Sequence, residues 1–489
     1  LAPADALLRH MYKGVVAVQA GEFETGARAM DRAWELTEER WTKRASDAAL
    51  AMVTSDAALP YYPGMAERLF IPYYGALNWL ARNERTHAAV EARRLSSLLE
   101  SDEQNPPEPR LRGVMRYVAG VTYELAGERN DAQVSFRNAA LLLDGALPGD
   151  TLPADALHGD VVIFLEDGFV GRPAPQVMTY WFNDDELALL TSEDDSARLA
   201  TATVLHRRRY DSRYDDDHWR SGSYRSVALT WPGFDDSDHG SLPLGARAIG
   251  AGASAESANR VAGDPAESGF QATGDPGWFD GAVADVVIAD VTASVHADFD
   301  RRQPMRLARA IARAAVRDAA MVAAGKSFES AAKADDKSED DDDDKDGGLD
   351  WGKVLLGIGL FATSATSAIL DQPDLRAWQV LPDRVGVARM RLPVGEHVIE
   401  VTRGSQVISL GTVSVLPGSV TLLTHRWFGV APSRCGAGSL HPAGRAADMT
   451  LQPASAGPQS TGMARSNSST ISTTGTTESM PATDLPACQ

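Results

Sequence analysis

The sequence predicts a multidomain α+β protein. Three observations lead to this prediction: helical periodicity with recurring small residues over 1–150, short apolar runs of strand length over 151–300, and alternating apolar residues with turn signals over 385–427. A chain of 489 residues is long enough for several domains. We therefore expect a helical N-terminal part, a β-containing middle and a small C-terminal module resembling a β-sandwich.

The clearest single pattern covers Ala119–Asp144 and predicts a helical hairpin of the tetratricopeptide repeat (TPR) type. Small residues recur where two helices must cross closely, and aromatic residues recur where one helix fills the groove of the other. A glycine falls at the turn, where positive φ is tolerated. Such a repeat offers a surface for another protein chain, but its fold does not name that chain. The residues predicted to pack the repeats are Gly120, Tyr123, Gly127, Ala132, Phe136, Ala139 and, in an earlier copy, Trp79.

Two looser copies precede this hairpin, over 14–36 and 75–95, and Asn83 occupies the turn of the second copy. Asparagine tolerates left-handed φ better than most residues. The uneven spacing of the copies excludes a regular array, so we expect extra helices over Trp41–Thr54 and Gly64–Leu69. The functional interpretation is a concave partner-binding surface, and the alternative is a helical bundle whose aromatic residues are all core.

The middle region contains three apolar runs that predict β-strands separated by long loops. They are Val161–Leu165, which ends at Glu166, Asp167 and Gly168, then Ser226–Trp231, and Ala284–Val295. Glu166 and Asp167 are a candidate pair of catalytic carboxylates, although a turn at the end of a strand accounts for them equally well.

A helix is predicted over 301–327, with Pro304 in its first turn. Its arginines recur at steps of three and four residues and therefore share one face. A basic stripe suits an acidic partner or lipid head groups, but a solvated or internally paired face is favoured in a chain of net charge −20. These arginines are Arg306, Arg309, Arg313 and Arg317.

Residues 354–370 carry no charge and are short for a membrane span, so a buried helix is favoured over a transmembrane one. The sequence has two cysteines, Cys435 and Cys488, and does not by itself establish whether they form a disulfide. The expected divisions are 1–150 (TPR-like repeats), 151–330 (α+β middle domain), 331–350 (acidic linker), 351–430 (apolar segment and β module) and 431–489 (low-complexity, disordered tail).

The sequence lacks recognisable nucleotide-binding, zinc-protease and serine-hydrolase motifs. The densest cluster of metal-type ligands, Asp215–His218, consists of adjacent residues that cannot all point at one ion. The acidic net charge of −20 argues against nucleic-acid binding by the whole chain. We therefore predict a protein without enzymatic activity, with no catalytic, cofactor-binding or metal-binding residues. The alternative is a hydrolase-like enzyme that uses Glu166 or Asp167.

Four segments, in this order, resemble a family of uncharacterised TPR-containing bacterial lipoproteins. The resemblance implies export to the periplasm and association with the outer membrane through an acylated cysteine. It implies no established activity, so the expected function is a scaffold that holds other envelope proteins. Membrane contact through 354–370, as part of a secretion or pore assembly, is the further alternative. The four segments are YYGALNWLARNERTHAAVEARRL, VVIFLEDG, RQPMRLARAIARAAVRD and DLRAWQVLPDRVGVARMRLPVGEHVIEV.

Overall fold

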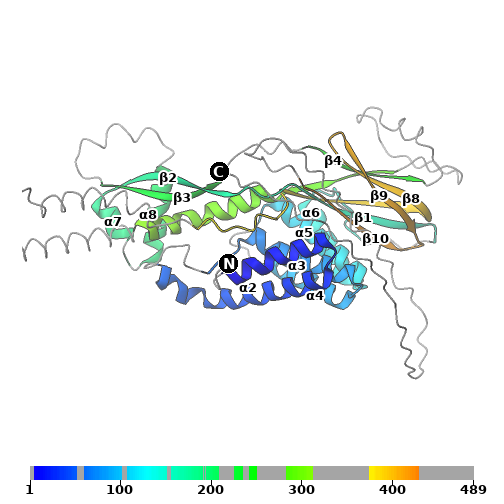
Figure 1. The fold of residues 1–489 in the computed structure, drawn as a ribbon, viewed down its shortest axis with the longest axis horizontal. Helices are drawn as coiled ribbons and strands as arrows, with labels where there is room; N and C mark the ends of the chain where they lie inside the picture. The colour runs from blue at the N-terminus through cyan, green and yellow to red at the C-terminus, as the bar shows by residue number, and fades with distance from the viewer. Residues whose placement is uncertain are drawn as a thin grey trace, which may run out of the picture. The chain divides into compact units, whose positions relative to one another are not determined.

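The N-terminal part of the chain forms three antiparallel helical hairpins in succession (Figure 1). The inner helices α1, α3 and α5 neighbour one another, and each packs against the helix that follows it. The computed structural model describes residues 5–51, 60–101, 107–150, 156–190, 192, 194–208, 225–234, 242–250, 282–311 and 374–428. All of them belong to one compact unit, Leu1–Pro453. The helices are α1 (Ala6–Ala20), α2 (Phe23–Ala51), α3 (Met65–Ala81), α4 (Arg85–Ser101), α5 (Pro109–Ala126) and α6 (Arg129–Leu142).

Residues with positive φ make the turns within the hairpins. Gly21, Asn83 and Gly127 have φ of 76°, 58° and 88°, respectively, so the turns expected at Asn83 and Gly127 are confirmed. Small residues allow the helices to approach each other closely. A Cβ atom at Gly120 would lie 2.5 Å from Cε1 of Phe136, on the opposite helix of the same hairpin. A helical hairpin is therefore present over the expected stretch, Ala119–Asp144.

The prediction of extra helices between the hairpins is wrong. Residues 41–51 continue α2, which runs unbroken for 29 residues. Residues 65–69 are the first turns of α3, which continues through Pro72. Although Pro72 cannot donate a backbone hydrogen bond, packing of nearly the whole circumference of α3 against its surroundings holds the helix together.

The strands form two four-stranded sheets and one two-stranded sheet (Figure 1). The inner sheet has the order β10-β1-β7-β6, the outer sheet has the order β5-β4-β8-β9, and β2 pairs with β3. Among the strands that the structure describes, only the pairing of β1 with β10 is parallel. The strands are β1 (His158–Asp167), β2 (Pro173–Phe182), β3 (Arg225–Phe234), β4 (Leu244–Gly250), β5 (Ala282–Asp285), β6 (Val287–Asp290), β7 (Arg384–Pro393), β8 (Gly395–Arg403), β9 (Gln406–Val415) and β10 (Val420–Trp427).

Two stretches of chain pass directly from one sheet to the other. Only Val286 separates β5 from β6, and only Val394 separates β7 from β8. Strand β1, from the middle of the sequence, lies between β7 and β10. The two sheets therefore combine stretches that the sequence analysis assigned to a middle domain and to a separate C-terminal module. At the coarser level, the expected mixture of an N-terminal helical part and C-terminal strands is correct.

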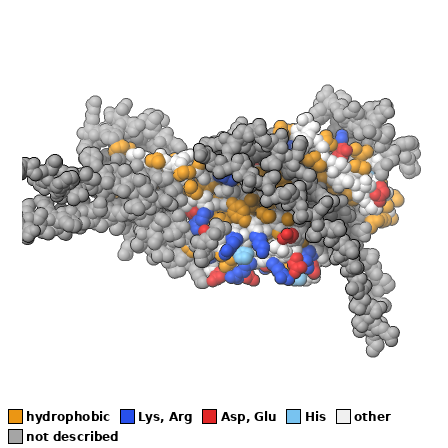
Figure 2. Space-filling view, viewed as in Figure 1, with side chains coloured by type: hydrophobic (Ala, Val, Ile, Leu, Met, Phe, Trp, Pro, Cys, Tyr) orange, Lys and Arg blue, Asp and Glu red, His pale blue; other side chains and the backbone are white. Residues whose placement is uncertain are grey.

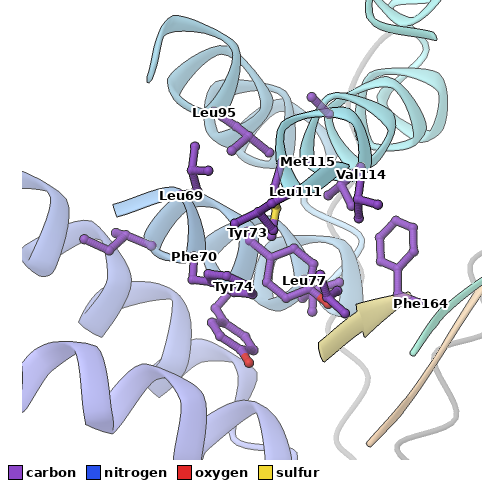
Figure 3. Close-up of a cluster of buried hydrophobic side chains, with 14 of the residues drawn as sticks. Leu69, Phe70, Tyr73, Tyr74, Leu77, Leu95, Leu111, Val114, Met115 and Phe164 are labelled. Carbon is purple, nitrogen blue, oxygen red and sulfur yellow. The ribbon is translucent and has the colours of Figure 1, made fainter. Parts of the chain in front are cut away.

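The inner sheet has a hydrophobic core on each face. On one face, Val162 and Phe164 of β1 join the core that the helices form around Tyr73 (Figure 3). On the other face, Val161 and Ile163 pack against residues of the outer sheet. The alternation of neighbouring β1 residues between the two cores follows from the period of two in a strand. Within the described residues, the helices, the inner sheet and the outer sheet thus pack as successive layers.

A smaller core lies where the β2–β3 sheet meets α7 (Asp184–Leu190), α8 (Asp195–Arg208) and the end of a helix described over 291–311. The strand expected over Ala284–Val295 is wrong beyond Asp290, because the carboxylate of Asp290 accepts a hydrogen bond from the Ala293 backbone (2.6 Å) and starts this helix. The stretch between β2 and β3, where the sequence analysis expected a long loop, contains the helices α7 and α8.

The helix expected over 301–327 therefore starts ten residues earlier, and Pro304 lies in its interior. Arg306 and Arg309 are half-buried rather than part of a free basic stripe, and the Arg306 guanidinium lies 4.8 Å from the Phe299 ring centroid. Several predictions fall outside the described residues: those on Asp215–His218, Arg313, Arg317, 331–350, 354–370 and 431–489, including both cysteines. Across the described ranges, no helix is long and apolar enough to cross a membrane.

Candidate functional site

The helices and the inner sheet are joined by buried polar side chains. At the centre, the adjacent residues Tyr73 and Tyr74 on α3 donate hydrogen bonds to the two carboxylate oxygens of Glu166, each at 2.9 Å. Burial, followed by the nearby Glu166 charge, raises the pKa of both tyrosines well above the ordinary value. The tyrosines therefore remain protonated donors, and one carboxylate of β1 fixes two consecutive residues of α3.

Arg426 of β10 provides the opposite charge for Glu166. Its Nη1 lies 3.2 Å from Oε2 of Glu166, and its Nη2 donates to the Val380 carbonyl at 2.7 Å. The guanidinium carbon lies 5.1 Å and 5.3 Å from the ring centroids of Phe169 and Phe428. Glu166 is thus buried, paired and hydrogen-bonded through both oxygens, an arrangement that stabilises a structural carboxylate.

Asp167 points to the other face of the inner sheet. It forms ion pairs with Arg384 of β7 and, at 2.7 Å, with Nε of Arg403 of β8. Because strand β1 continues through Asp167, the two adjacent carboxylates lie on opposite faces of the sheet. The hypothesis that Glu166 and Asp167 act as one carboxylate pair is therefore wrong. The period of two in a strand could have shown this, had the end of β1 been placed correctly.

Arg389 of β7 is the centre of a second tie, by which we mean a set of buried polar contacts that joins the helices to the inner sheet. The sequence analysis did not identify this set. The Arg389 guanidinium donates to both carboxylate oxygens of Glu124 on α5, at 2.9 Å and 3.1 Å, and to Asp160 on β1 at 2.6 Å. It also lies 5.5 Å from the ring centroid of Phe136. Burial raises the pKa of the neighbouring Tyr117 to about 12, despite the opposing effect of Arg389. These contacts fix α5 and α6 on the inner sheet.

An irregular segment, 374–382, lies against α1 and the start of α3. The Tyr12 hydroxyl donates to the Ala377 carbonyl and accepts from the Gln379 amide, each at 3.0 Å. The Trp378 amide donates to Glu67 at 3.0 Å, and the Trp378 side chain is almost fully buried. Helices α1 and α3 therefore hold this irregular segment of the same chain by hydrogen bonds to its backbone.

The predicted packing residues of the last hairpin lie together. Tyr123, Ala132, Phe136 and Ala139 are all buried between α5 and α6 or against their neighbours. Trp79 is only partly buried, and its ring stacks on His87 at 4.5 Å between centroids. Their positions account for hairpin packing and do not by themselves indicate a ligand.

The outer helices α4 and α6 present matching exposed residues. Val90 and Arg93 follow the turn residue Asn83 by seven and ten positions, and Val134 and Arg137 follow Gly127 by the same intervals. All four are exposed, as is Leu141 one turn beyond Arg137. Residues three apart on a helix share a face. We call these five residues the outer stripe. On the view in Figure 2, basic, acidic and histidine side chains are interspersed over the helical part.

No family model, curated protein or solved structure matches the chain. Over the described ranges, no group of three or more His, Cys, Asp and Glu side chains is placed to hold a metal ion. Chemically, the buried carboxylates described above act as ties between layers, because arginine, tyrosine or backbone donors occupy them.

Proposed function

We propose that this protein is a protein-binding scaffold without enzymatic activity, which uses TPR-like hairpins to hold other proteins of a bacterial cell envelope. The observation that carries the proposal is the outer stripe, in which an exposed valine and an exposed arginine recur at the same positions of successive hairpins. Arginine is enriched at protein–protein interfaces, and the fully buried centre of an interface is more apolar than the rest of the protein surface.

The outer stripe replaces the concave surface that the sequence suggested for partners. The inner helices α1, α3 and α5 are already in contact with the inner sheet and the 374–382 segment. A partner on that face would have to displace these contacts, including the buried Glu166 and Arg389 ties. The outer faces of α4 and α6 require no such displacement, so we assign partner binding to them.

The neighbouring ion pairs support a rigid binding surface. Arg93 pairs with Glu128 at 2.5 Å, which links α4 to the turn of the next hairpin, and Arg94 pairs with Asp31 of α2 at 2.8 Å. A surface whose backbone positions are fixed before binding loses less conformational entropy when a partner docks. Periplasmic location and outer-membrane association are part of the proposal and derive from the family resemblance of the sequence.

The test is affinity purification from gently solubilised envelopes, with the bound proteins identified by mass spectrometry. We expect a reproducible set of envelope proteins with the wild type and its loss with the double variant Val134→Asp, Leu141→Asp. The matched control is Val16→Asp on α1, because Val16 (57% exposed) and Val134 (58%) are equally accessible. The proposal fails if no protein is enriched, or if both variants retain the same partners.

A further inference from the structure

Helices α2 and α4 are bridged by the guanidinium group of Arg94. Its Nη1 atom donates to Asp31 of α2 at 2.8 Å and to Glu91 of α4 at 2.6 Å. The same guanidinium lies 5.2 Å from the ring centroid of Trp34, which is also on α2. Two carboxyl groups therefore meet at a single donor atom, where the first hairpin, α1–α2, adjoins the second hairpin, α3–α4.

Glu91 lacks the donors that a buried carboxylate requires. It is 2% exposed, and its Oε2 atom has no hydrogen-bond partner among the described residues. The carboxyl group lies against the backbone of α3, where a Cβ atom at Gly75 would come within 2.9 Å of Oε2. Glu166, by contrast, receives hydrogen bonds on both oxygens. Because a buried carboxylate that is only half satisfied carries a large desolvation cost, the geometry favours the protonated form of Glu91.

The charged groups with the largest effect on Glu91 lie on α2 and α4, whereas α3 faces it with the backbone at Gly75. Burial raises the pKa of Glu91 to about 8; the Arg94 charge opposes this rise, and the Asp31 charge adds to it. A hydrogen bond between the two carboxyl groups, in which protonated Glu91 is the donor, acts in the same direction as Asp31. The proton on Glu91 is thus itself a link from α4 to α2.

We propose that Asp31, Glu91 and Arg94 form a proton-controlled latch that fastens the first hairpin to the second. With the proton on Glu91, the carboxyl pair bridges α2 and α4. Without the proton, two carboxylates repel each other beside one arginine, and the first hairpin opens while the later helices and the sheets remain folded. The inference concerns buried residues rather than the outer stripe and does not depend on the proposed scaffold function.

Opening of the first hairpin has a consequence for the segment 374–382. Among the described helices, α1 and α2 pack chiefly against each other and against α3. Tyr12 of α1 accepts a hydrogen bond from the Gln379 amide at 3.0 Å and donates to the Ala377 carbonyl at the same distance. Both bonds are lost when α1 moves away, so the latch also controls how firmly the segment 374–382 is held.

The test is residue-resolved hydrogen exchange of the full chain at pH 6 and pH 8, with each rate divided by the intrinsic rate at that pH. We expect the amides of Met30, Ala33 and Gln379 to open at least about tenfold more often at pH 8, because opening lowers the pKa of Glu91 from about 8 toward its ordinary value of 4.5. At pH 8 these amides should also open at least about tenfold more often than those of Ile163 and Phe164 in β1, which report unfolding of the sheet.

Matched variants separate the latch from other effects of pH. In Glu91→Gln the increase between pH 6 and pH 8 should disappear, because glutamine keeps the shape of the side chain and cannot ionise. Asp31→Asn should reduce the increase, because one of the two carboxyl charges is removed. Glu35→Gln, at an exposed position of α2, should behave as the wild type.

Three results overturn the proposal. The first is a wild type at pH 8 whose α2 amides open no more often than those of β1, since Glu91 would then be exposed only by unfolding of the whole unit. The second is a Glu91→Gln variant that keeps the wild-type increase. The third is an Asp31→Asn variant whose increase equals that of the wild type, because the carboxyl pair would then have no part in fastening the hairpin.

Discussion

The buried Glu91 makes the stability of the helical layer depend on pH. Its side chain is 2% exposed and accepts a hydrogen bond from Nη1 of Arg94 at 2.6 Å, and Asp31 of α2 accepts from the same Nη1 atom at 2.8 Å. Burial raises the pKa of Glu91 from 4.5 to about 8, with Asp31 adding to the rise and Arg94 opposing it. Near neutral pH the folded protein therefore holds a proton that the unfolded chain has lost.

The direction and size of the effect follow from this difference in pKa. Between pH 4.5 and 8 the folded state binds more protons than the unfolded state, so the free energy of unfolding falls as the pH rises through this range. A difference from 4.5 to about 8 corresponds to roughly 5 kcal/mol at most. Between pH 5 and pH 8 the Glu91 contribution should decrease by about 3–4 kcal/mol.

The variant Glu91→Gln keeps the shape of the protonated side chain and cannot ionise. We expect its free energy of unfolding, measured by urea denaturation with circular dichroism, to exceed that of the wild type by an increasing amount from pH 5 to pH 8. Other titrating groups contribute equally to both proteins and cancel in the difference. The control is Glu35→Gln, a change at an exposed position. Its free energy of unfolding should differ from that of the wild type by close to zero at every pH. Parallel pH profiles for the wild type and Glu91→Gln would refute the reasoning.

Three further changes have defined outcomes in the same unfolding assay. Gly120→Ala forces a methyl group to within 2.5 Å of Phe136 and should cost about 1–3 kcal/mol. Arg426→Met leaves Glu166 buried without its charge partner and should cost about 3–5 kcal/mol, much of which a second change, Glu166→Gln, should restore. Asn83→Gly should be close to neutral because of its φ of 58°, whereas Asn83→Ala should cost about 1 kcal/mol.

The predictions for Gly120 and Arg426 have controls on the helical surface. Arg28→Met breaks an exposed ion pair with Glu24 and should change stability by less than about 1 kcal/mol. Asn130→Ala changes an exposed position of α6 without adding volume to the core. The packing argument for Gly120 is wrong if its alanine variant is as stable as the Asn130 variant. The charge argument is wrong if Arg426→Met costs no more than Arg28→Met.

Local chemistry made the helical hairpins predictable from the sequence. The turn at Gly127, the close crossing at Gly120 and the left-handed Asn83 each depend on residues a few positions apart, and periodicity records such relations directly. The apolar run at Val161–Leu165 likewise predicted a strand, which the structure contains as the centre of β1. Where neighbours in the sequence decide the structure, the prediction was sound.

Contacts between distant residues were not predictable in this way. The partners Glu166 and Arg426 are 260 positions apart, and Asp167 and Arg384 are 217 positions apart. No local pattern indicates which strand will lie beside β1, so the carboxylates at its end were read as a turn or a catalytic pair. The helix over 291–311 was misread because β-branched residues near its start resemble a strand, while a single side chain, Asp290, sets its first turn.

The central place of β1 has a consequence for the synthesis of the protein. The strand leaves the ribosome 217 positions before Arg384 of β7, and β10 follows later still. At roughly 5–20 residues per second, the nascent chain carries β1 for about 10–40 s before β7 and β10 can cover its two sides. During that interval β1 lacks both of its neighbouring strands, and Val161, Ile163 and Leu165 on its face toward the outer sheet lack β8 and β9, so we expect ribosome-bound chains to be the state in which this protein most needs a chaperone.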